Sequence, residues 1–368
     1  MMTKSNSKNK SHYTVLGVMS GTSLDGIDLC LARFELQHSW QFQILSAKTV
    51  PYSKNWQQRL GAALDLSPQD LEVLNADYTS LLAGIIQPFI DSHSTISIDA
   101  VCSHGHTVFH EPHLGKTLQI GNLPVLATYI NQTVVCDFRT QDVALGGHGA
   151  PLVPIGDVLL FSEHDFCLNL GGFANISFEL KNQRIAFDVC PVNIVLNHYV
   201  QTLGVAYDAE GQIALKGTVS KPLLEALNAL EFYNLPPPKS LGLEWVQNEV
   251  FSTIEAFDLD VKQILRTVVE HCAIQISTVL NSHHLQNGLI TGGGVFNSFL
   301  MQRISALYRQ EIPPTNSTLI EYKEALIFGF LGVLKLRNES NCLQSVTGAS
   351  RNHSSGSIYF PEKHRKRV

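Results

Sequence analysis

The stretch YTVLGVMSGTSLDGIDLCLARF, Tyr13–Phe34, gives the first clear structural signal in this sequence. Tyr13–Met19 is rich in β-branched and aliphatic residues, and Ile27–Phe34 alternates apolar with polar residues. Both patterns predict strands. The intervening segment SGTSLDG, Ser20–Gly26, is bounded by glycines, so the whole stretch predicts a β-hairpin with a long turn.

A related arrangement recurs later in the chain. Phe166–Leu170 and Asn175–Leu180 are apolar runs on either side of Gly171–Gly172, and Arg184–Val189 predicts a further strand. Two strand–glycine–strand units suggest an internal duplication.

Helical periodicity appears in several longer segments between and after these strands. They are Asn193–Leu203, Lys221–Leu230, Val261–Asn281, Asn297–Tyr308 and Lys323–Arg337. Strands that alternate with helices predict an α/β protein with mixed sheets. The polar, glycine-rich QDVALGGHG predicts a boundary between two parts of the chain near Thr140–Gly149.

Composition narrows the function classes. The chain has 368 residues, 44% of them hydrophobic, which excludes intrinsic disorder and suggests about two or three domains. The net charge of -6 gives no overall basic field, so nucleic acid is not an expected partner. The longest apolar run, near Ile327–Leu334, is too short to span a membrane.

The cysteine pattern indicates the redox environment. Seven cysteines are spread along the chain, mostly inside apolar runs, and no CxxC occurs. Buried free thiols in a reducing cytosol explain this better than a disulfide framework or a thiolate metal cluster. The polar N-terminus has no apolar core of a secretory signal.

The turn SGTSLDG has the composition of a phosphate-binding loop. Its glycines allow close approach of a ligand, and the hydroxyl groups of Thr22 and Ser23 can donate to phosphate oxygens. Asp25 could hold a magnesium ion through water. The spacing is not GxxxxGK[ST], so this is no Walker A loop, and an ordinary hairpin turn is an equal alternative.

Two further segments place polar or glycine residues at strand ends. In FDVCPVN, Phe187–Asn193, the carboxylate of Asp188 ends a strand, where it projects into a cleft or caps the following helix. In LITGGGVFN, Leu289–Asn297, three glycines lie between a strand and a helix. They exceed the needs of a tight turn, which favours ligand binding there.

Histidine and arginine mark two more segments. SHGHTVFHEPH contains His104, His106, His110 and His113, but without the HExxH spacing of a zinc protein. We expect polar histidines there and no zinc site. In CDFRTQD, Arg139 could clamp a substrate carboxylate, or could form an ion pair with Asp137 or Asp142.

In combination, the chain resembles the anhydro-N-acetylmuramic acid kinase family. The resemblance spans Gly17 to about Ser350. The segments that carry it are GVMSGTSLDGID, SHGHTVFHEP, LQIG, VVCDFRTQDVALGGHGAPLVP, NLGGFANIS, FDVCPVN, PPKSLG, TGGGVFN, KEALIFGFLG and VTGAS.

The resemblance implies a fold, because the family belongs to the group of sugar kinases, Hsp70-type ATPases and actin. We therefore expect a two-lobed, actin-like ATPase fold with ribonuclease H-like lobes, mixed sheets, flanking helices and ATP in the cleft between the lobes. The N-terminal lobe is expected at residues 13–140, completed by residues 338–360. The C-terminal lobe is expected at residues 141–337.

The resemblance also implies a reaction of cell-wall amino sugar recycling. The family uses ATP to phosphorylate O6 of 1,6-anhydro-N-acetylmuramic acid while water opens the anhydro bridge, giving N-acetylmuramic acid 6-phosphate and ADP. A cytoplasmic enzyme with ATP, Mg²⁺ and a small sugar as its partners is expected, with no membrane partner and with a homodimer left open. The alternative is a degenerate, non-catalytic regulatory member that binds nucleotide or sugar.

Site residues follow from the same resemblance. Asp188 matches the family's general base, and Asp25 is the expected magnesium ligand through water. The expected ATP contacts are Gly21, Thr22, Ser23, Leu24, Asp25, Gly26, Ile27, Asp28, Gly292, Gly293 and Gly294. The expected substrate-side contacts are Arg139, which would hold the lactyl carboxylate, and His106, Asn193 and Glu324.

The chain departs from the family pattern at two places. The family form F-D-T-G-P-G-N reads FDVCPVN here, with Val189, Cys190 and Val192 in place of small residues or glycine. His106 stands where the family usually has Gln. Bulkier residues could narrow the pocket or shift substrate preference, but the carboxylate of Asp188 is retained.

Overall fold

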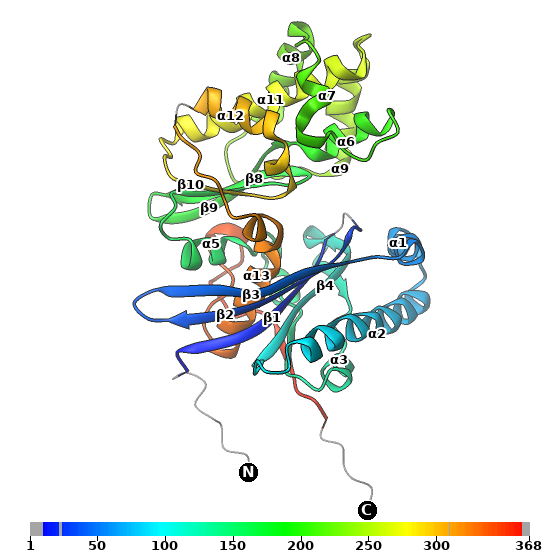
Figure 1. Ribbon diagram of the computed structural model, residues 1–368, viewed down its shortest axis with the longest axis vertical. Coiled ribbons are helices and arrows are strands. Elements are labelled where there is room, and N and C mark those ends of the chain that lie inside the picture. Colours follow the sequence, from blue (N-terminus) through cyan, green and yellow to red (C-terminus); the bar gives the residue numbers. More distant parts are fainter. Residues whose placement is uncertain (1–9, 22–23, 309, 363–368) are drawn as a thin grey trace, which may run out of the picture. The chain divides into compact units, whose positions relative to one another are not determined.

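The computed structural model describes residues 10–21, 24–308 and 310–362, and the chain divides into two compact units (Figure 1). Unit 1 contains the chain up to Leu160 and again from Tyr322 onwards, and unit 2 is Phe161–Glu321. The chain therefore leaves unit 1 once and returns to it.

Unit 1 contains a seven-stranded mixed sheet in the order β11-β6-β4-β1-β2-β3, with β5 paired to β4. Its strands β1, β4 and β6 are parallel neighbours, and the other pairs are antiparallel. The strands are β1 (His12–Ser20), β2 (Gly26–Leu36), β3 (Trp40–Pro51), β4 (Ala100–Glu111), β5 (Lys116–Ile120), β6 (Val134–Cys136) and β11 (Ser357–Tyr359).

The predicted first hairpin is confirmed. Strands β1 and β2 pair from His12↔Glu35 to Ser20↔Ile27, and the turn lies between Ser20 and Gly26. Side chains alternate between the two sheet faces. Leu16 and Val18 accordingly share a core with helix α2 (Pro68–Ser92), which contributes Leu74, Tyr78, Leu82 and Ile86 at helical spacing.

Helix α13 (Ser317–Leu336) lies against the sheet at unusually short range. A Cβ placed on Gly17 would lie 1.9 Å from the carbonyl oxygen of Ala325, and one on Gly332 would lie 2.1 Å from Sγ of Cys102. Glycine is therefore required at both positions for α13 to pack on β1 and β4. Gly332, the last residue of the KEALIFGFLG segment, thus has a packing role.

The shorter helices of unit 1 connect its strands. They are α1 (Lys54–Gly61), η2 (Ala63–Asp65), η3 (Pro112–Leu114), α3 (Val125–Tyr129), α4 (Thr140–Ala144), α5 (Pro154–Leu160) and α14 (Gln344–Thr347). Figure 1 shows α2 and α3 beside the sheet.

The unit boundaries differ from the expected lobe boundaries. Residues 141–160 were expected in the C-terminal lobe but belong to unit 1, as does the chain from Tyr322. Side-chain contacts explain this: Thr347 Oγ1 donates to Asp142 at 2.8 Å, and Lys323 Nζ lies 2.8 Å from Asp157. These contacts join both segments to unit 1, and the glycine-rich segment near 140–149 lies inside it.

Unit 2 contains a four-stranded sheet in the order β10-β7-β8-β9. Its strands are β7 (Phe166–Leu170), β8 (Phe173–Leu180), β9 (Gln183–Pro191) and β10 (Gly288–Thr291), with β7 and β10 parallel. The predicted β7–β8 hairpin and the following strand are confirmed. The internal duplication stays a hypothesis.

Helix α11 (Val261–Ser282) supplies much of the core of unit 2. A capping box between Asp260 and Gln263 starts this helix. The other helices are α6 (Asn193–Gln201), η4 (Ala209–Gly211), α7 (Gln212–Leu215), α8 (Lys221–Asn228), η5 (Glu231–Asn234), α9 (Leu243–Trp245), η6 (Val246–Phe251), α10 (Ser252–Glu255), η7 (Gly293–Phe296) and α12 (Ser298–Tyr308).

The α/β class with mixed sheets is thus confirmed, and each predicted long helix forms. Only α13 differs markedly, because it begins at Ser317, earlier than predicted. All seven cysteines are buried and free, as expected. Within the described ranges, no helix has both the length and the apolar character needed to cross a bilayer.

Candidate active site

The turn between β1 and β2 is held mainly by backbone contacts. Leu24 has a positive φ of 59°, and its N–H faces the carbonyl oxygen of Gly21 at 3.5 Å. Gln57 Nε2 donates to the carbonyl oxygen of Leu24 at 3.1 Å, and Tyr52 N–H donates to that of Asp25 at 3.3 Å. Thr22 and Ser23 lie outside the described residues.

A buried polar network lies at the start of this turn. The hydroxyl of Ser20 is 2.6 Å from the Tyr52 hydroxyl and 3.0 Å from Nδ1 of His106. The Tyr52 hydroxyl is in turn 2.5 Å from that of Tyr78. Burial lowers the pKa of His106 to about 4, so at neutral pH the ring is uncharged. His106 therefore supports the turn through Ser20.

The acidic residues of the turn differ in their surroundings. The side chain of Asp25 is exposed, whereas Asp28 accepts a 2.6 Å hydrogen bond from Thr49 Oγ1. Mg²⁺ prefers oxygen ligands and keeps several of its waters. An exposed carboxylate in a loop of this kind fits a hydrated Mg²⁺ at Asp25.

Gly26 has a local packing role. A Cβ on Gly26 would lie 2.6 Å from the carbonyl oxygen of Val50 on β3. The close pairing of β2 with β3 therefore requires glycine at this position, whether or not a ligand binds nearby.

Arg139 is anchored within unit 1. His104 donates from Nδ1 to the carbonyl oxygen of Gly105, which leaves its Nε2 to accept a 2.8 Å bond from Arg139 Nε. Arg139 Nη1 donates to the carbonyl oxygen of Gly149 at 2.6 Å. Burial lowers the pKa of Arg139, although Glu324 opposes this shift.

The two carboxylates considered for an ion pair with Arg139 have other partners. Asp137 accepts from Thr140 at 2.6 Å, and Asp142 accepts from Thr347 and from the Gly149 N–H. The side chain of Glu324 reaches solvent, yet the dense protein around it raises its pKa, with Arg139 opposing the shift.

The four histidines of the SHGHTVFHEPH segment have separate environments. His104 and His106 bond Arg139 and Ser20, whereas His110 Nδ1 lies 2.9 Å from Thr117 Oγ1. His113 is exposed after β4. The absence of zinc from this segment stays a prediction.

Asp188 lies at an irregular strand end in unit 2. It pairs with Asn175 while Cys190 pairs with Ala174, so Val189 is the extra residue of a β-bulge. Leu241 N–H donates to Oδ2 of Asp188 at 2.8 Å, and Asp188 N–H donates to the Lys239 carbonyl at 3.0 Å. Burial raises the pKa of Asp188, and the bond from Leu241 opposes this shift.

The capping role considered for Asp188 is wrong. The residue at the N-cap of α6 is Val192, which makes no side-chain capping bond. The next residue, Asn193, donates from Nδ2 to the carbonyl oxygen of Leu170 at 3.4 Å. Asn193 therefore fixes the start of α6 to the end of β7.

The three glycines after β10 are not equivalent. Gly292 has a φ of 87°, and a Cβ there would lie 2.6 Å from Asn169 Oδ1. A Cβ on Gly294 would lie 2.8 Å from Cβ of Leu170, so both glycines are required for packing on β7. Gly293 is exposed, with open space around its would-be Cβ. Of these three glycines, only Gly293 does not pack on β7 and is therefore open to contact with a ligand.

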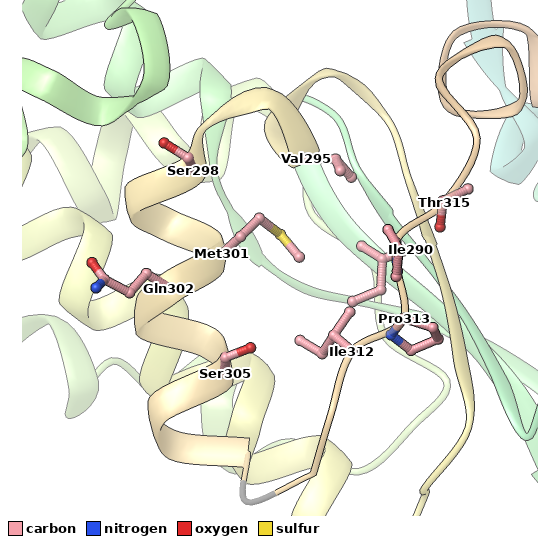
Figure 2. A pocket seen from close by; sticks show the side chains of 10 residues that line it. Ile290, Val295, Ser298, Met301, Gln302, Ser305, Ile312, Pro313 and Thr315 are labelled. Atoms are coloured by element: carbon pink, nitrogen blue, oxygen red, sulfur yellow. The ribbon is translucent and has the colours of Figure 1, made fainter.

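A cavity of about 230 Å³ follows these glycines in unit 2. Figure 2 shows Met301 of α12 pointing toward Ile290 and Ile312, with Val295 and Thr315 across the opening. The lining is mixed, apolar on the sheet side and polar at Ser298, Gln302 and Ser305. Such a cavity suits a flat group with a few polar edges.

The sequence of the PPKSLG segment indicated no role for it, although the backbone groups of Leu241 and Lys239 form hydrogen bonds with Asp188. The Lys239 ammonium donates to the carbonyl oxygen of Phe232 at 2.9 Å and lies 4.5 Å from the centre of its ring. Its burial lowers its pKa. The rigid prolines were the only sequence signal for a fixed loop here.

Comparison with known proteins identifies the family to which the chain belongs. The family model for anhydro-N-acetylmuramic acid kinase matches residues 13–361. An anhydro-N-acetylmuramic acid kinase of Pasteurella multocida is 35% identical over 372 residues, covering 95% of this chain and 97% of that protein. The Bacillus cereus protein of the same name is 32% identical over 383 residues, covering 94% and 99%.

Solved structures are more distant. Component A of (R)-2-hydroxyglutaryl-CoA dehydratase from Acidaminococcus fermentans has a TM-score of 0.44 and 11% identity, covering 88% of this chain and 99% of that one. A ROK family glucokinase from Streptomyces griseus has a TM-score of 0.37 and 12% identity, covering 86% and 98%. The sequence matches, which extend over nearly the whole chain, confirm the predicted family and its kinase class. The chain belongs to the anhydro-N-acetylmuramic acid kinase family.

Proposed function

We propose that the protein uses ATP to open the 1,6-anhydro bridge of 1,6-anhydro-N-acetylmuramic acid with water and to phosphorylate O6. The products are N-acetylmuramic acid 6-phosphate and ADP. The observation that carries the proposal for this chain is the Asp188 carboxylate, which is half-buried, has a raised pKa and is oriented by the Leu241 N–H.

Asp188 acts as the general base. One carboxylate oxygen is held by Leu241, which leaves the other to take a proton from the attacking water. The water oxygen bonds to the anomeric carbon as the bond from that carbon to the bridging oxygen breaks. The electron pair stays on the bridging oxygen, O6, which attacks the γ-phosphorus while ADP leaves. The proton on Asp188 then returns to solvent.

Unit 1 supplies the phosphate side of the reaction. The proposed ATP contacts are Gly21, Thr22, Ser23, Leu24, Asp25, Gly26, Ile27 and Asp28, with Mg²⁺ held at Asp25 through water. When bound, Mg²⁺ neutralises the charge that develops on the phosphates. Arg139 is proposed to bind the lactyl carboxylate, with His104 fixing its orientation, and His106 and Glu324 are proposed as further substrate contacts.

Unit 2 supplies the groups that bind the nucleoside, as well as the general base Asp188. Gly293 is proposed to contact the nucleotide. Gly292 and Gly294 hold Gly293 in position by packing on β7. The neighbouring cavity at Val295 and Met301 suits the adenine ring. Asn193 keeps the end of β7 and the start of α6 together beside these groups. We place the enzyme in the cytoplasm, where ATP is available.

A product assay tests this function. The full chain is incubated with ATP, Mg²⁺ and the anhydro sugar, and ADP and sugar phosphate are measured by mass spectrometry. We expect equal amounts of ADP and N-acetylmuramic acid 6-phosphate, with N-acetylmuramic acid and N-acetylglucosamine as poor substrates. Tight binding of ATP or sugar without turnover would instead support the regulatory alternative, and equal kcat/KM for the open and anhydro sugars would exclude the coupled reaction.

A further inference from the structure

A second group of chemically versatile side chains lies in unit 1, apart from the residues assigned to catalysis. Asp142 belongs to α4, whereas Cys342 and His353 face each other across an isolated antiparallel bridge. The three residues are 0%, 2% and 5% exposed. One carboxylate oxygen, the sulfur and one ring nitrogen all lie within 4.8 Å of one another.

The tautomer of His353 follows from its contacts. Nδ1 lies 3.1 Å from the carbonyl oxygen of Arg351, which can only accept, so Nδ1 carries a hydrogen. Nε2 then lies 3.5 Å from Oδ1 of Asp142 and has no hydrogen-bond partner among the described residues. A ring lone pair then faces a carboxylate oxygen with no donor between them, an arrangement that a metal ion between the two groups would satisfy.

Two hydrogen-bond donors hold the carboxylate of Asp142. Its Oδ2 accepts a 2.7 Å bond from the Gly149 N–H, and its Oδ1 accepts a 2.8 Å bond from the Thr347 hydroxyl. These two donors fix its orientation, in the way outer partners fix a metal ligand.

The distances within this group fit ligands around a metal ion. A charge-assisted N–H···O bond is typically about 2.7–2.9 Å long, shorter than the 3.5 Å between His353 and Asp142. The Cys342 thiol faces Asn341 Oδ1 at 3.6 Å, a long contact that leaves its sulfur able to serve as a third ligand. A metal ion bound there would displace the thiol proton.

We propose that Asp142, Cys342 and His353 bind a zinc ion. Nitrogen, sulfur and carboxylate oxygen together form a zinc-type ligand set, and a closed, buried set is typical of structural zinc. The buried Ser355 hydroxyl lies beside Cys342, so it or a water completes the four ligands.

The zinc ion joins two distant segments of unit 1. It links α4, which follows Arg139, to the 341–355 segment, where the Thr347 and Gly149 contacts of Asp142 already lie. None of its ligands belongs to the proposed catalytic or substrate set, although Cys342 and Asp142 lie within electrostatic range of Arg139.

Metal analysis of the full chain, purified without an affinity tag or added metal, tests the proposal. We expect about one zinc per chain, lost in Cys342→Ser and His353→Ala. His113→Ala is the matched control: it removes an exposed histidine of the other histidine segment and should keep the zinc. Retention of zinc in both site variants, or its loss in the control, would overturn the assignment.

A cobalt titration of the wild-type chain keeps the test independent of how the variants fold. After chelation, Co²⁺ should produce the charge-transfer absorption of a thiolate–cobalt bond, and zinc should remove it. Chelation should also lower the melting temperature. Absence of zinc from the purified protein together with no thiolate–cobalt absorption would overturn the proposal.

Discussion

The backbone N–H of Leu241 donates a 2.8 Å hydrogen bond to Oδ2 of Asp188, across 53 residues of sequence. The bond occupies one oxygen of the proposed base and opposes the effect of burial, which raises the pKa of Asp188. Orientation and basicity of the carboxylate therefore depend on a loop that contributes no reactive side chain.

Leu241→Pro removes this N–H and tests the loop. A hydrogen bond to a charged group is worth about 1.5–3 kcal/mol, so its loss should raise the pKa of Asp188 by about one to two pH units. Since the base acts when ionised, the acid limb of kcat/KM should move to higher pH by that amount. Leu241→Ala keeps the N–H and should leave the limb in place. An unmoved limb in a well-folded Leu241→Pro protein would refute the role of this bond.

His106→Gln tests the network below the phosphate turn. Because His106 is neutral and contacts Ser20, an uncharged hydrogen-bonding residue should keep turnover within about threefold. His106→Leu removes the partner of Ser20 and should cost about 1–3 kcal/mol in the free energy of unfolding, measured in urea. Equal stability of the Leu and Gln variants would show that the contact is dispensable.

Gly293→Ala and Gly292→Ala separate ligand contact from packing. Gly293 is open, so its variant should fold with unchanged stability but show a raised KM for ATP. Gly292 has a positive φ and a close neighbour, so its variant should lose about 2 kcal/mol or more of stability. An unchanged KM for ATP in Gly293→Ala would show that the nucleotide does not bind at this turn.

Asp25→Ala tests the magnesium assignment. Loss of an outer ligand typically costs about 10–100-fold in metal affinity, so the Mg²⁺ concentration for half-maximal activity should rise by at least roughly tenfold. Turnover at saturating Mg²⁺ should recover in part. The same Mg²⁺ dependence in variant and wild type would show that Asp25 is not the ligand.

The local elements were predictable because they depend on neighbouring residues. Alternation in Ile27–Phe34 and the glycines of the turn predicted the first hairpin. The contact from Leu241 to Asp188 was not predictable, since no local pattern encodes a bond between a loop amide and a distant side chain.

The glycines illustrate a second limit. The triple glycine predicted ligand binding, yet Gly292 and Gly294 are needed for packing on β7, a requirement visible only when the strand is in place. The unit boundaries were missed for a similar reason: the contacts of Asp142 with Thr347 and of Asp157 with Lys323 join segments far apart in sequence.

The most direct test of the central claim is the turnover of Asp188→Asn on the anhydro sugar, measured together with its ATP affinity by calorimetry. Asparagine has nearly the same shape and can still accept from Leu241, but it cannot take a proton from water. We predict that kcat falls by roughly 100-fold or more while the Kd for ATP is nearly unchanged. The control Asp258→Asn, at an exposed position of unit 2, should behave as wild type. Near-normal turnover by a folded Asp188→Asn protein would contradict the account.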